Sequence, residues 1–215
     1  MNFNFKEETG FTIIELIISI FVLSVGVIGI FSIFSMVVVL TSDSSDRLTA
    51  TYLAQEGMEI VRNIRDTNWL HMDICASGVT PLPDGVSCPA SWLDGFSEIS
   101  ACSNINTGCE ADYTSKTSMS GNSGEYLYIN NENGFYGYNQ NNATITKFQR
   151  KIIISPVEDI DGKSDHIIKV TVEVFWDKKS TILSPGVTAQ SDGCGPSNCI
   201  STEGTLYDWY NYINH

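Results

Sequence analysis

The chain has 215 residues and a strong acidic excess, with 25 Asp and Glu against 12 Lys and Arg and a formal net charge of -13. This charge disfavours nucleic acid as a partner, and the sequence contains no basic stripe with interleaved aromatic side chains. An apolar run occupies most of about the first forty residues, which leaves length for one modest domain.

The first ten residues, MNFNFKEETG, are polar and mixed in charge. They lack the basic start and small-residue cleavage site of a secretory signal peptide, and they precede the apolar run instead of containing it. Lys6 lies before the run, and Asp43 and Asp46 follow it. This charge distribution predicts a single-pass protein with its N-terminus in the cytoplasm.

The apolar run extends from Phe11 to Leu40 and contains one charged residue, Glu15. As a helix these residues would be about 45 Å long, against about 30 Å for the hydrocarbon core of a membrane. Tilt can absorb part of the excess length, and burial against other helices would use all of it. The run therefore predicts a transmembrane helix that also packs against other helices.

Glu15 is the main candidate functional residue, because a carboxylate that faces lipid is costly. No Lys or Arg occurs between Lys6 and Arg47, so Glu15 has no cation on its own apolar helix. Either Glu15 is protonated in the membrane, or the cation comes from a chain terminus or another molecule. A cut after Gly10 would create an amine on Phe11, and a neighbouring helix shifted by about 6 Å would bring that amine to Glu15.

The helical pattern continues beyond Leu40 without a Gly or Pro break. Within it, the residues Leu53, Gly57, Ile60 and Ile64 recur at i, i+4, i+7 and i+11. This spacing forms one stripe of an amphipathic helix. We therefore predict one helix from Phe11 to about Arg65, whose second half packs on a soluble domain.

The remaining sequence predicts an irregular region followed by an antiparallel sheet, and the chain as a whole belongs to the α+β class. Turn signals such as TPLPDG and MSGNSG mark the irregular part. The β-branched and aromatic runs EYLYIN, GFYGYN, ITKFQRKIIIS and HIIKVTVEVFW predict strands of a meander, and TLYDWYNYIN a possible last one. The predicted segments are a leader at 1–10, a transmembrane helix at 11–40, its amphipathic continuation at 41–66, a Cys-containing loop region at 67–124, the sheet at 125–176 and a C-terminal loop with a probable last strand at 177–215.

Six cysteines follow the apolar run, namely Cys75, Cys88, Cys102, Cys109, Cys194 and Cys199. An even number in loop-like sequence beyond a membrane segment predicts disulfides in an oxidising compartment. Zinc is the weaker alternative, since no C-x2-C spacing occurs and the three histidines are not grouped near a cysteine pair. Because short loops close at the least entropic cost, we predict pairing between neighbours in the sequence.

Other candidate sites are weaker. Asp159, Asp161 and Asp165 lie around a glycine and form a weak calcium candidate, although acids around glycine are ordinary hairpin chemistry. The aromatic residues near the C-terminus, Tyr207, Trp209, Tyr210 and Tyr212, would form either an adhesive patch or part of the core. No catalytic or phosphate-binding motif occurs at a recognised spacing, so we expect neither enzymatic activity nor a cofactor.

The segment GFTIIELIIS resembles the prepilin cleavage and methylation signature of type IV pilins, type II secretion pseudopilins and competence pilins. By this resemblance Gly10 precedes the cleavage site, Phe11 becomes the first mature residue with a methylated amine, and Glu15 sets subunit register. The implied partners are a prepilin peptidase, the membrane and other pilin subunits, which bind through the N-terminal helix. The implied location is the bacterial inner membrane and then an extracellular filament at the cell surface.

The segments VLSVGVIGIF and TYLAQEGMEIVRNIRD further resemble the minor subunits of the pilin-modification and secretion I types. Our interpretation is thus a structural minor pilin or pseudopilin. Two alternatives stay open. One is an adhesin or ligand-binding head displayed at a filament tip, and the other is a signal-anchored surface protein unrelated to pili.

Overall fold

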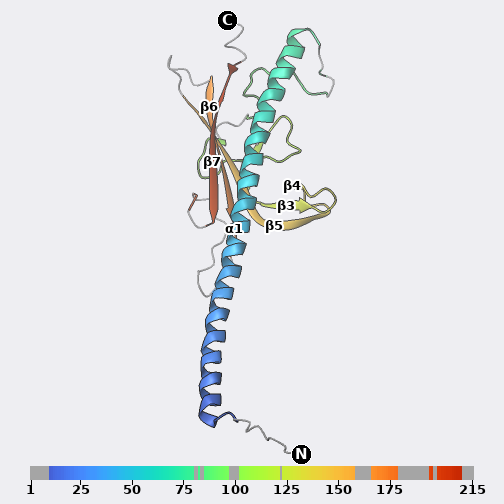
Figure 1. The fold of residues 1–215 in the computed structure, drawn as a ribbon. Helices are drawn as coiled ribbons and strands as arrows, with labels where there is room; N and C mark the ends of the chain where they lie inside the picture. Colours follow the sequence, from blue (N-terminus) through green and yellow to red (C-terminus); the bar gives the residue numbers. More distant parts are fainter. Residues whose placement is uncertain are drawn as a thin grey trace, which may run out of the picture. The chain divides into compact units, whose positions relative to one another are not determined.

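The computed structural model describes residues 10–79, 82, 85–96, 102–121, 123–157, 166–178, 194, 195 and 198–209. These residues form two compact units, which divide between Ser45 and Asp46. The fold is α+β, as predicted. It contains the 64-residue helix α1 (Ile13–Ala76), with an apolar first half, and a seven-stranded antiparallel sheet among the described residues (Figure 1).

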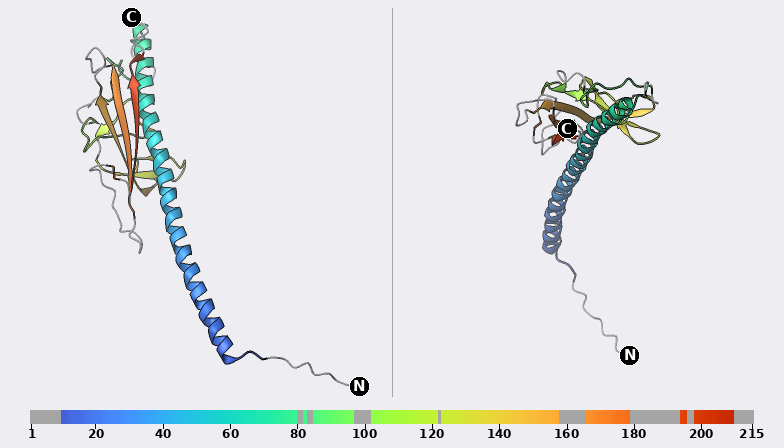
Figure 2. Two further views of the ribbon diagram at one scale, coloured as in Figure 1. Left: turned by 60° about the vertical axis from the view of Figure 1, so that its left-hand side comes forward. Right: turned by 90° about the horizontal axis from the view of Figure 1, so that it is seen from above.

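The second half of α1 packs on the sheet through the stripe predicted from the sequence. Leu53, Gly57, Ile60 and Ile64 are all buried, and Figure 2 shows this part of the helix alongside the strands. A Cβ atom on Gly57 would lie 2.8 Å from Val172 Cγ1, closer than real Cβ contacts. Glycine therefore allows the helix backbone to approach the sheet more closely than any side chain would.

The helix ends at Ala76, about three helical turns beyond the predicted end near Arg65. Residues 66–76 contain neither Gly nor Pro, and Trp69 is buried, so the helix continues as long as it has a core to cover. It stops where Gly78 adopts a φ of 87° and its N–H donates to the Cys75 carbonyl at 3.0 Å. A glycine in this left-handed region is a common helix stop signal.

The sheet contains a meander, but only in its second half. Strands β5 (Ala143–Pro156), β6 (Ile167–Trp176) and β7 (Cys199–Tyr207) follow one another as antiparallel neighbours. The order of β3 (Tyr126–Asn130) and β4 (Tyr136–Gly137) differs from the predicted meander, because β3 pairs with both β4 and β5. Only two residues of GFYGYN form strand, which is too short to offer β5 a full partner.

Two further predictions need correction. The region 67–124 is not wholly irregular, since β1 (Cys109–Glu110) pairs with β5 and with β2 (Ser120–Gly121). The last described strand begins at residue 199, not at the predicted 205, because its pairing starts opposite Phe175 of β6. Of the segment TLYDWYNYIN, only residues 205–207 lie in β7.

The central strand β5 is buried on both faces. On one face, Ile152 and Ile154 belong to the main core with α1. On the other face Lys151 is 1% exposed, and its ammonium group donates to the Ile105 carbonyl at 2.9 Å and lies 2.9 Å from Glu173 Oε2. The loop around Ile105 therefore covers the face of the sheet that points away from the helix.

Arg150 connects three parts of the head and is 1% exposed. From β5 its guanidinium donates to the carbonyl of Leu53 in α1 at 3.1 Å and to the carbonyl of Ala111 after β1. Its Nη1 also lies 3.4 Å from Oε2 of Glu56, a partly exposed carboxylate on α1. A buried charge needs such partners, so helix, sheet and loop meet at this side chain.

The six cysteines form the three neighbour disulfides predicted from the sequence, Cys75–Cys88, Cys102–Cys109 and Cys194–Cys199. The first joins the end of α1 to the loop after it, and the second joins a loop residue to β1. The third joins Cys194 to the first residue of β7, Cys199, across a separation of five residues. Each disulfide thus ties loop sequence to a regular element, which reduces the entropy of the unfolded chain.

Replacing Arg150 with alanine is expected to destabilise the head by about 3 kcal/mol or more, since it removes buried hydrogen bonds and leaves a cavity. The control is Lys169→Ala, which removes a 2.9 Å ion pair with Glu203 between two largely exposed side chains. That change should cost less than about 1 kcal/mol. Guanidinium chloride denaturation followed by tryptophan fluorescence measures both, and equal shifts in the two variants would contradict the role given to Arg150.

Candidate functional site

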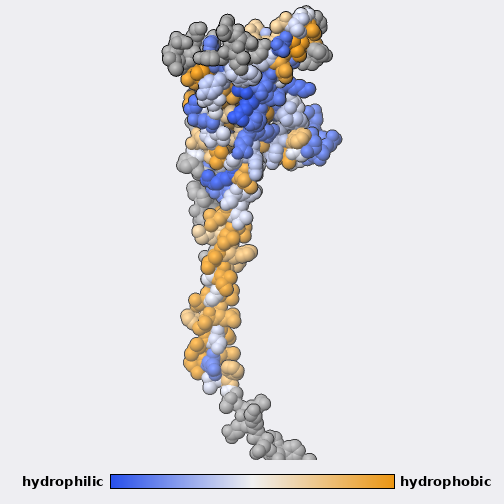
Figure 3. All heavy atoms as spheres, turned by 45° about the horizontal axis from the view of Figure 1, so that its top comes forward, coloured by the Kyte–Doolittle hydropathy of each residue, from blue (hydrophilic) through white to orange (hydrophobic). Residues whose placement is uncertain are grey.

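The N-terminal part of α1 presents apolar side chains to its surroundings on every side. Apart from Val39, the large apolar residues from Phe11 to Leu40 are between 51% and 82% exposed. Figure 3 shows this segment as a nearly continuous hydrophobic surface. By length and composition α1 contains a segment able to cross a membrane. Such a helix indicates a membrane anchor or signal, and the three disulfides indicate that the head lies outside the cytoplasm.

Thr12 is the N-cap of α1, a role that the sequence analysis did not assign. Its hydroxyl oxygen accepts the N–H of Glu15 at 3.4 Å, and its carbonyl accepts the N–H of Leu16 at 3.2 Å. Thr followed three residues later by Glu is the pattern of a capping box, which could have been found in the sequence. Glu15 therefore lies in the first turn of α1, where the helix dipole favours a negative charge.

This position gives Glu15 a structural role at the start of α1. The N-terminal dipole stabilises an exposed carboxylate by about 0.3–1 kcal/mol. A charge at the centre of a bilayer costs about 2.5–3.5 kcal/mol or more, and the cost is smaller for Glu15 because it lies near one end of the apolar segment. The helix dipole thus offsets part of the cost of an apolar environment.

Gly10 and Phe11 precede the first turn of α1, and both are exposed. A Cβ atom added to Gly10 would meet nothing within 4 Å, and its φ does not lie in the left-handed region. The described structure therefore does not require glycine at this position. A requirement for glycine would have to come from another molecule that contacts this segment.

Two hydroxyl groups within the apolar segment bond to their own helix. Ser19 donates to the Glu15 carbonyl and Ser24 to the Ile20 carbonyl, each at 2.7 Å. Such bonds satisfy a hydroxyl without any partner helix. In the described arrangement these serines therefore act locally.

The other predicted site residues are dispersed. The calcium candidates Asp159, Asp161 and Asp165 lie outside the described residues, and so do Tyr210 and Tyr212. No group of three or more possible metal ligands occurs within the described part of the chain. Trp209 is half exposed, and its ring lies 4.6 Å from that of buried Trp69 in an edge-on contact. This residue therefore contributes both to the core and to the surface.

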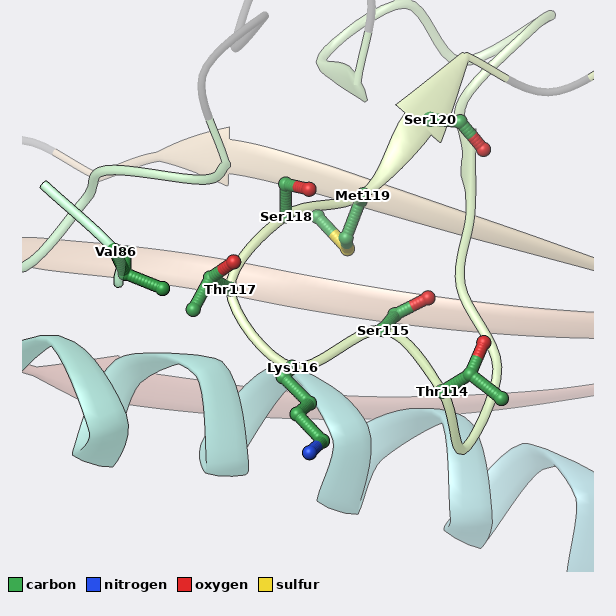
Figure 4. Close-up of a pocket in the computed structure, with 8 residues that line it drawn as sticks. All are labelled: Val86, Thr114, Ser115, Lys116, Thr117, Ser118, Met119 and Ser120. Carbon is green, nitrogen blue, oxygen red and sulfur yellow. The ribbon is translucent and has the colours of Figure 1, made fainter. Parts of the chain in front are cut away.

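A cavity of about 500 Å³ lies beside the loop between β1 and β2 (Figure 4). Its lining consists of Val86, Thr114, Ser115, Lys116, Thr117, Ser118, Met119 and Ser120. The loop is held in place because the Met119 N–H donates to the Gly95 carbonyl at 3.0 Å. The lining offers hydroxyls and one ammonium group, and none of these eight residues carries a carboxylate or an imidazole.

Two buried carboxylates organise the loops around this cavity, and their pKa values shift in opposite directions. Burial raises the pKa of Glu110, although N–H groups of residues 123–125 donate to its Oε1 and partly oppose the shift. Burial alone would also raise the pKa of Asp112. This effect of burial is outweighed by three hydrogen bonds, from the Thr114 hydroxyl and from the N–H groups of Tyr138 and Thr114, together with the charge of Arg150. The net result is a lowered pKa for Asp112.

The sequence analysis missed both carboxylates, because nothing near them in the sequence distinguishes them from surface acids. Apart from Thr114, which is two residues from Asp112, their partners are distant in the sequence; Ser123 is 13 residues from Glu110 and Tyr138 is 26 residues from Asp112. Only folding brings these groups together. Their role in the described structure is to position loops, and no substrate-binding or catalytic arrangement surrounds them among the described residues.

Comparison of the chain with protein-family models, curated proteins and solved structures finds no match in any of the three. The architecture itself is pilin-like. A long N-terminal helix has an apolar first half, and its second half packs on an antiparallel sheet. The fold thus defines a class of architecture, and the role within that class rests on the chemistry of residues 10–40.

The two carboxylates should make opposite contributions to the pH dependence of stability. Ionised Asp112 stabilises the fold at pH values above its unfolded pKa, and this stabilisation disappears as the pH falls through its lowered folded pKa. Glu110, whose folded pKa is raised, binds its proton more tightly when folded, so its contribution worsens as the pH rises above its unfolded pKa.

Denaturation measured between acid and neutral pH should therefore separate two matched variants. Relative to the native chain, Asp112→Asn should lose more stability at neutral pH than in acid. The reason is that both Oδ1 and Oδ2 of ionised Asp112 accept hydrogen bonds, whereas an amide has only one acceptor oxygen. Glu110→Gln keeps an oxygen for the Ser123 N–H, so its stability relative to the native chain should rise with pH. Parallel pH profiles for the two variants would contradict the opposite shifts.

Proposed function

We propose that this chain is a structural subunit of a type IV pilus-like or type II secretion filament, made as a membrane-inserted precursor and cleaved after Gly10. The main support is the largely exposed apolar segment from Phe11 to Leu40, which carries Glu15 as its single charge. Burying one large apolar side chain is worth about 1.5–3 kcal/mol. The apolar side chains of this segment would therefore need cover from lipid in the precursor and from neighbouring helices in the filament.

The lone carboxylate supports assembly over simple anchoring. A signal anchor needs hydrophobicity, and for a carboxylate in lipid the small stabilisation by the helix dipole offsets only part of the cost. Cleavage would place a new ammonium group at Phe11, within the same first turns of the chain as Glu15. Pairing the amine of one subunit with the carboxylate of the next would satisfy both charges and set the stagger between their helices.

The finer assignment is a minor subunit that helps to start assembly, and its support is the resemblance of residues 51–66 to such subunits. In this proposal the partners are a prepilin peptidase, the membrane and other pilin-like chains. The subunit acts without enzymatic activity of its own and without nucleic acid. It moves from the bacterial inner membrane to an extracellular filament.

A second candidate function is a ligand-binding head at a filament tip, which the exposed aromatic residues of the head favour. It is compatible with the first proposal, because a filament subunit can carry a binding head. A signal-anchored surface protein unrelated to filaments is the remaining alternative. It predicts an intact bond between Gly10 and Phe11.

Processing is tested by the intact mass of the chain in its native cells. We expect the loss of residues 1–10 and one added methyl group on Phe11, and Gly10→Leu should leave the precursor in the membrane. Gly26→Ala is the matched control, since a Cβ there also meets nothing within 4 Å. The control should be processed normally. Assembled material that keeps Met1 would exclude cleavage.

Assembly is tested by replacing Glu15 with alanine. This variant should insert into membranes normally, while its incorporation into filaments falls at least about tenfold, which corresponds to 1.4 kcal/mol for an unpaired charge. Glu59→Ala is the control, because Glu59 is exposed and pairs with Arg62 on the surface of α1. Subunits are counted in sheared filaments, and the same count tests the minor rank. Normal incorporation of Glu15→Ala would refute the pairing.

A further inference from the structure

Two exposed aromatic rings lie in contact on the head, far from the N-terminal segment. Tyr113 follows β1, and Phe135 lies immediately before β4, on the hairpin with β3. Their ring centroids are 5.2 Å apart, with 49° between the ring planes. Tyr113 is 42% exposed and Phe135 56% exposed. The pair adds little to the core, so folding alone does not account for it.

The backbone under both rings is firmly held. Asp112 Oδ2 accepts the Tyr138 N–H at 3.0 Å, which ties the Tyr113 loop to the hairpin. A Cβ atom on Gly137 would lie 3.2 Å from Tyr113 Cε1, so glycine leaves room for the ring. On the other side, Asn133 Oδ1 accepts the Phe135 N–H at 2.9 Å. Preorganised rings lose little entropy when a ligand binds.

Asparagine side chains lie on two adjoining turns, residues 131–134, which lead directly into Phe135, and residues 139–142. The turns are joined because the Asn131 N–H donates to the Asn142 carbonyl at 3.0 Å. The side-chain amide oxygens (Oδ1) of Asn131, Asn133 and Asn139 each accept a hydrogen bond from within the chain. Within the described part of the chain, these three side chains take part in hydrogen bonds through their oxygen atoms, and their NH2 groups donate to no protein acceptor. These groups remain available as oriented donors.

The composition of the hairpin supports a binding surface. Residues 126–146 contain five aromatic residues, six asparagines and a single charged residue, Glu132, in a chain with a net charge of -13. Tyr, Asn and Gly are the residues enriched in antibody binding loops, where rigid rings provide contact area and amides provide hydrogen bonds. The segment thus carries a single charge in a strongly acidic chain, and it is rich in side chains that can contact a ligand.

We propose that Tyr113, Phe135 and the neighbouring asparagine amides form a binding site for a neutral carbohydrate. A sugar ring has a C–H face that can stack on an aromatic ring, and hydroxyl oxygens that accept from amide NH2 groups. An anionic sugar is disfavoured by the net charge and by Glu132. This proposal goes beyond the filament role, because the site lies entirely in the head and does not need cleavage after Gly10.

A protein partner fits these observations less well. A stable protein interface buries about 800 Å² on each partner, usually with an apolar centre. Here two rings are surrounded by polar amides, which offers a small contact area with many hydrogen-bond donors. A saccharide of a few units needs only one or two stacked rings. The expected affinity is correspondingly weak, with a Kd on the order of 1 mM.

The test uses the full chain in micelles of an alkyl phosphocholine detergent, since sugar-based detergents would compete for the site. Saturation-transfer NMR is recorded with cellotriose, chitotriose and lactose, and with 3′-sialyllactose as the anionic comparison. At least one neutral saccharide should bind, and sialyllactose should bind more weakly than lactose. Phe135→Ala and Tyr113→Ala should each weaken binding about tenfold, which corresponds to 1.4 kcal/mol.

Two controls separate stacking from folding. Phe135→Trp preserves a ring and should retain binding, while Tyr207→Ala removes an equally exposed aromatic residue on β7 and should leave binding unchanged. The proposal is overturned if none of the saccharides binds, or if binding survives both alanine changes. It is also overturned if these changes impair filament incorporation without any saccharide binding, since the pair would then contact another subunit. A failure of cleavage after Gly10 would refute the filament role and leave saccharide binding intact.

Discussion

The buried charge of Arg150 is the constraint on which the arrangement of the head depends. A guanidinium removed from water must regain hydrogen bonds, and here the acceptors come from α1 and from the loop after β1. Neither acceptor is near Arg150 in the sequence, so the charge is satisfied only when helix, sheet and loop are all in place. Gly57 contributes to the same contact, because its missing side chain leaves room for Arg150 Cδ and for Val172.

The helix α1 faces two different environments along its length. From about Ala50 onward, its apolar stripe is covered by the sheet of its own chain. Before Leu40, the apolar residues have no cover within the described chain. The head can thus fold as a unit with its own core, whereas the N-terminal segment needs lipid or other helices. This division is the physical basis of the proposed change from membrane protein to filament subunit.

Much of the fold could be predicted because it depends on local pattern. The stripe at Leu53 to Ile64 follows from helical periodicity, and the three disulfides follow from short separations. The errors arose where the deciding contact is distant. The helix continues to Ala76 because Trp69 has a core to enter, and β3 lies beside β5 because β4 is too short to pair with it. The Thr12 cap was a local signal that the prediction missed.

The sequence by itself determined the apolar segment, the unpartnered Glu15, the α+β class and the pairing of the cysteines, since each depends on periodicity, charge or separation along the chain. Only the tertiary structure decided which charged residues are buried and which aromatic residues stay exposed. Lys151 and Arg150 look like surface residues in the sequence, yet both are 1% exposed. Tyr113 and Phe135 look like core residues, yet they meet at the surface. Burial depends on contacts between distant segments, and neither composition nor periodicity specifies those contacts.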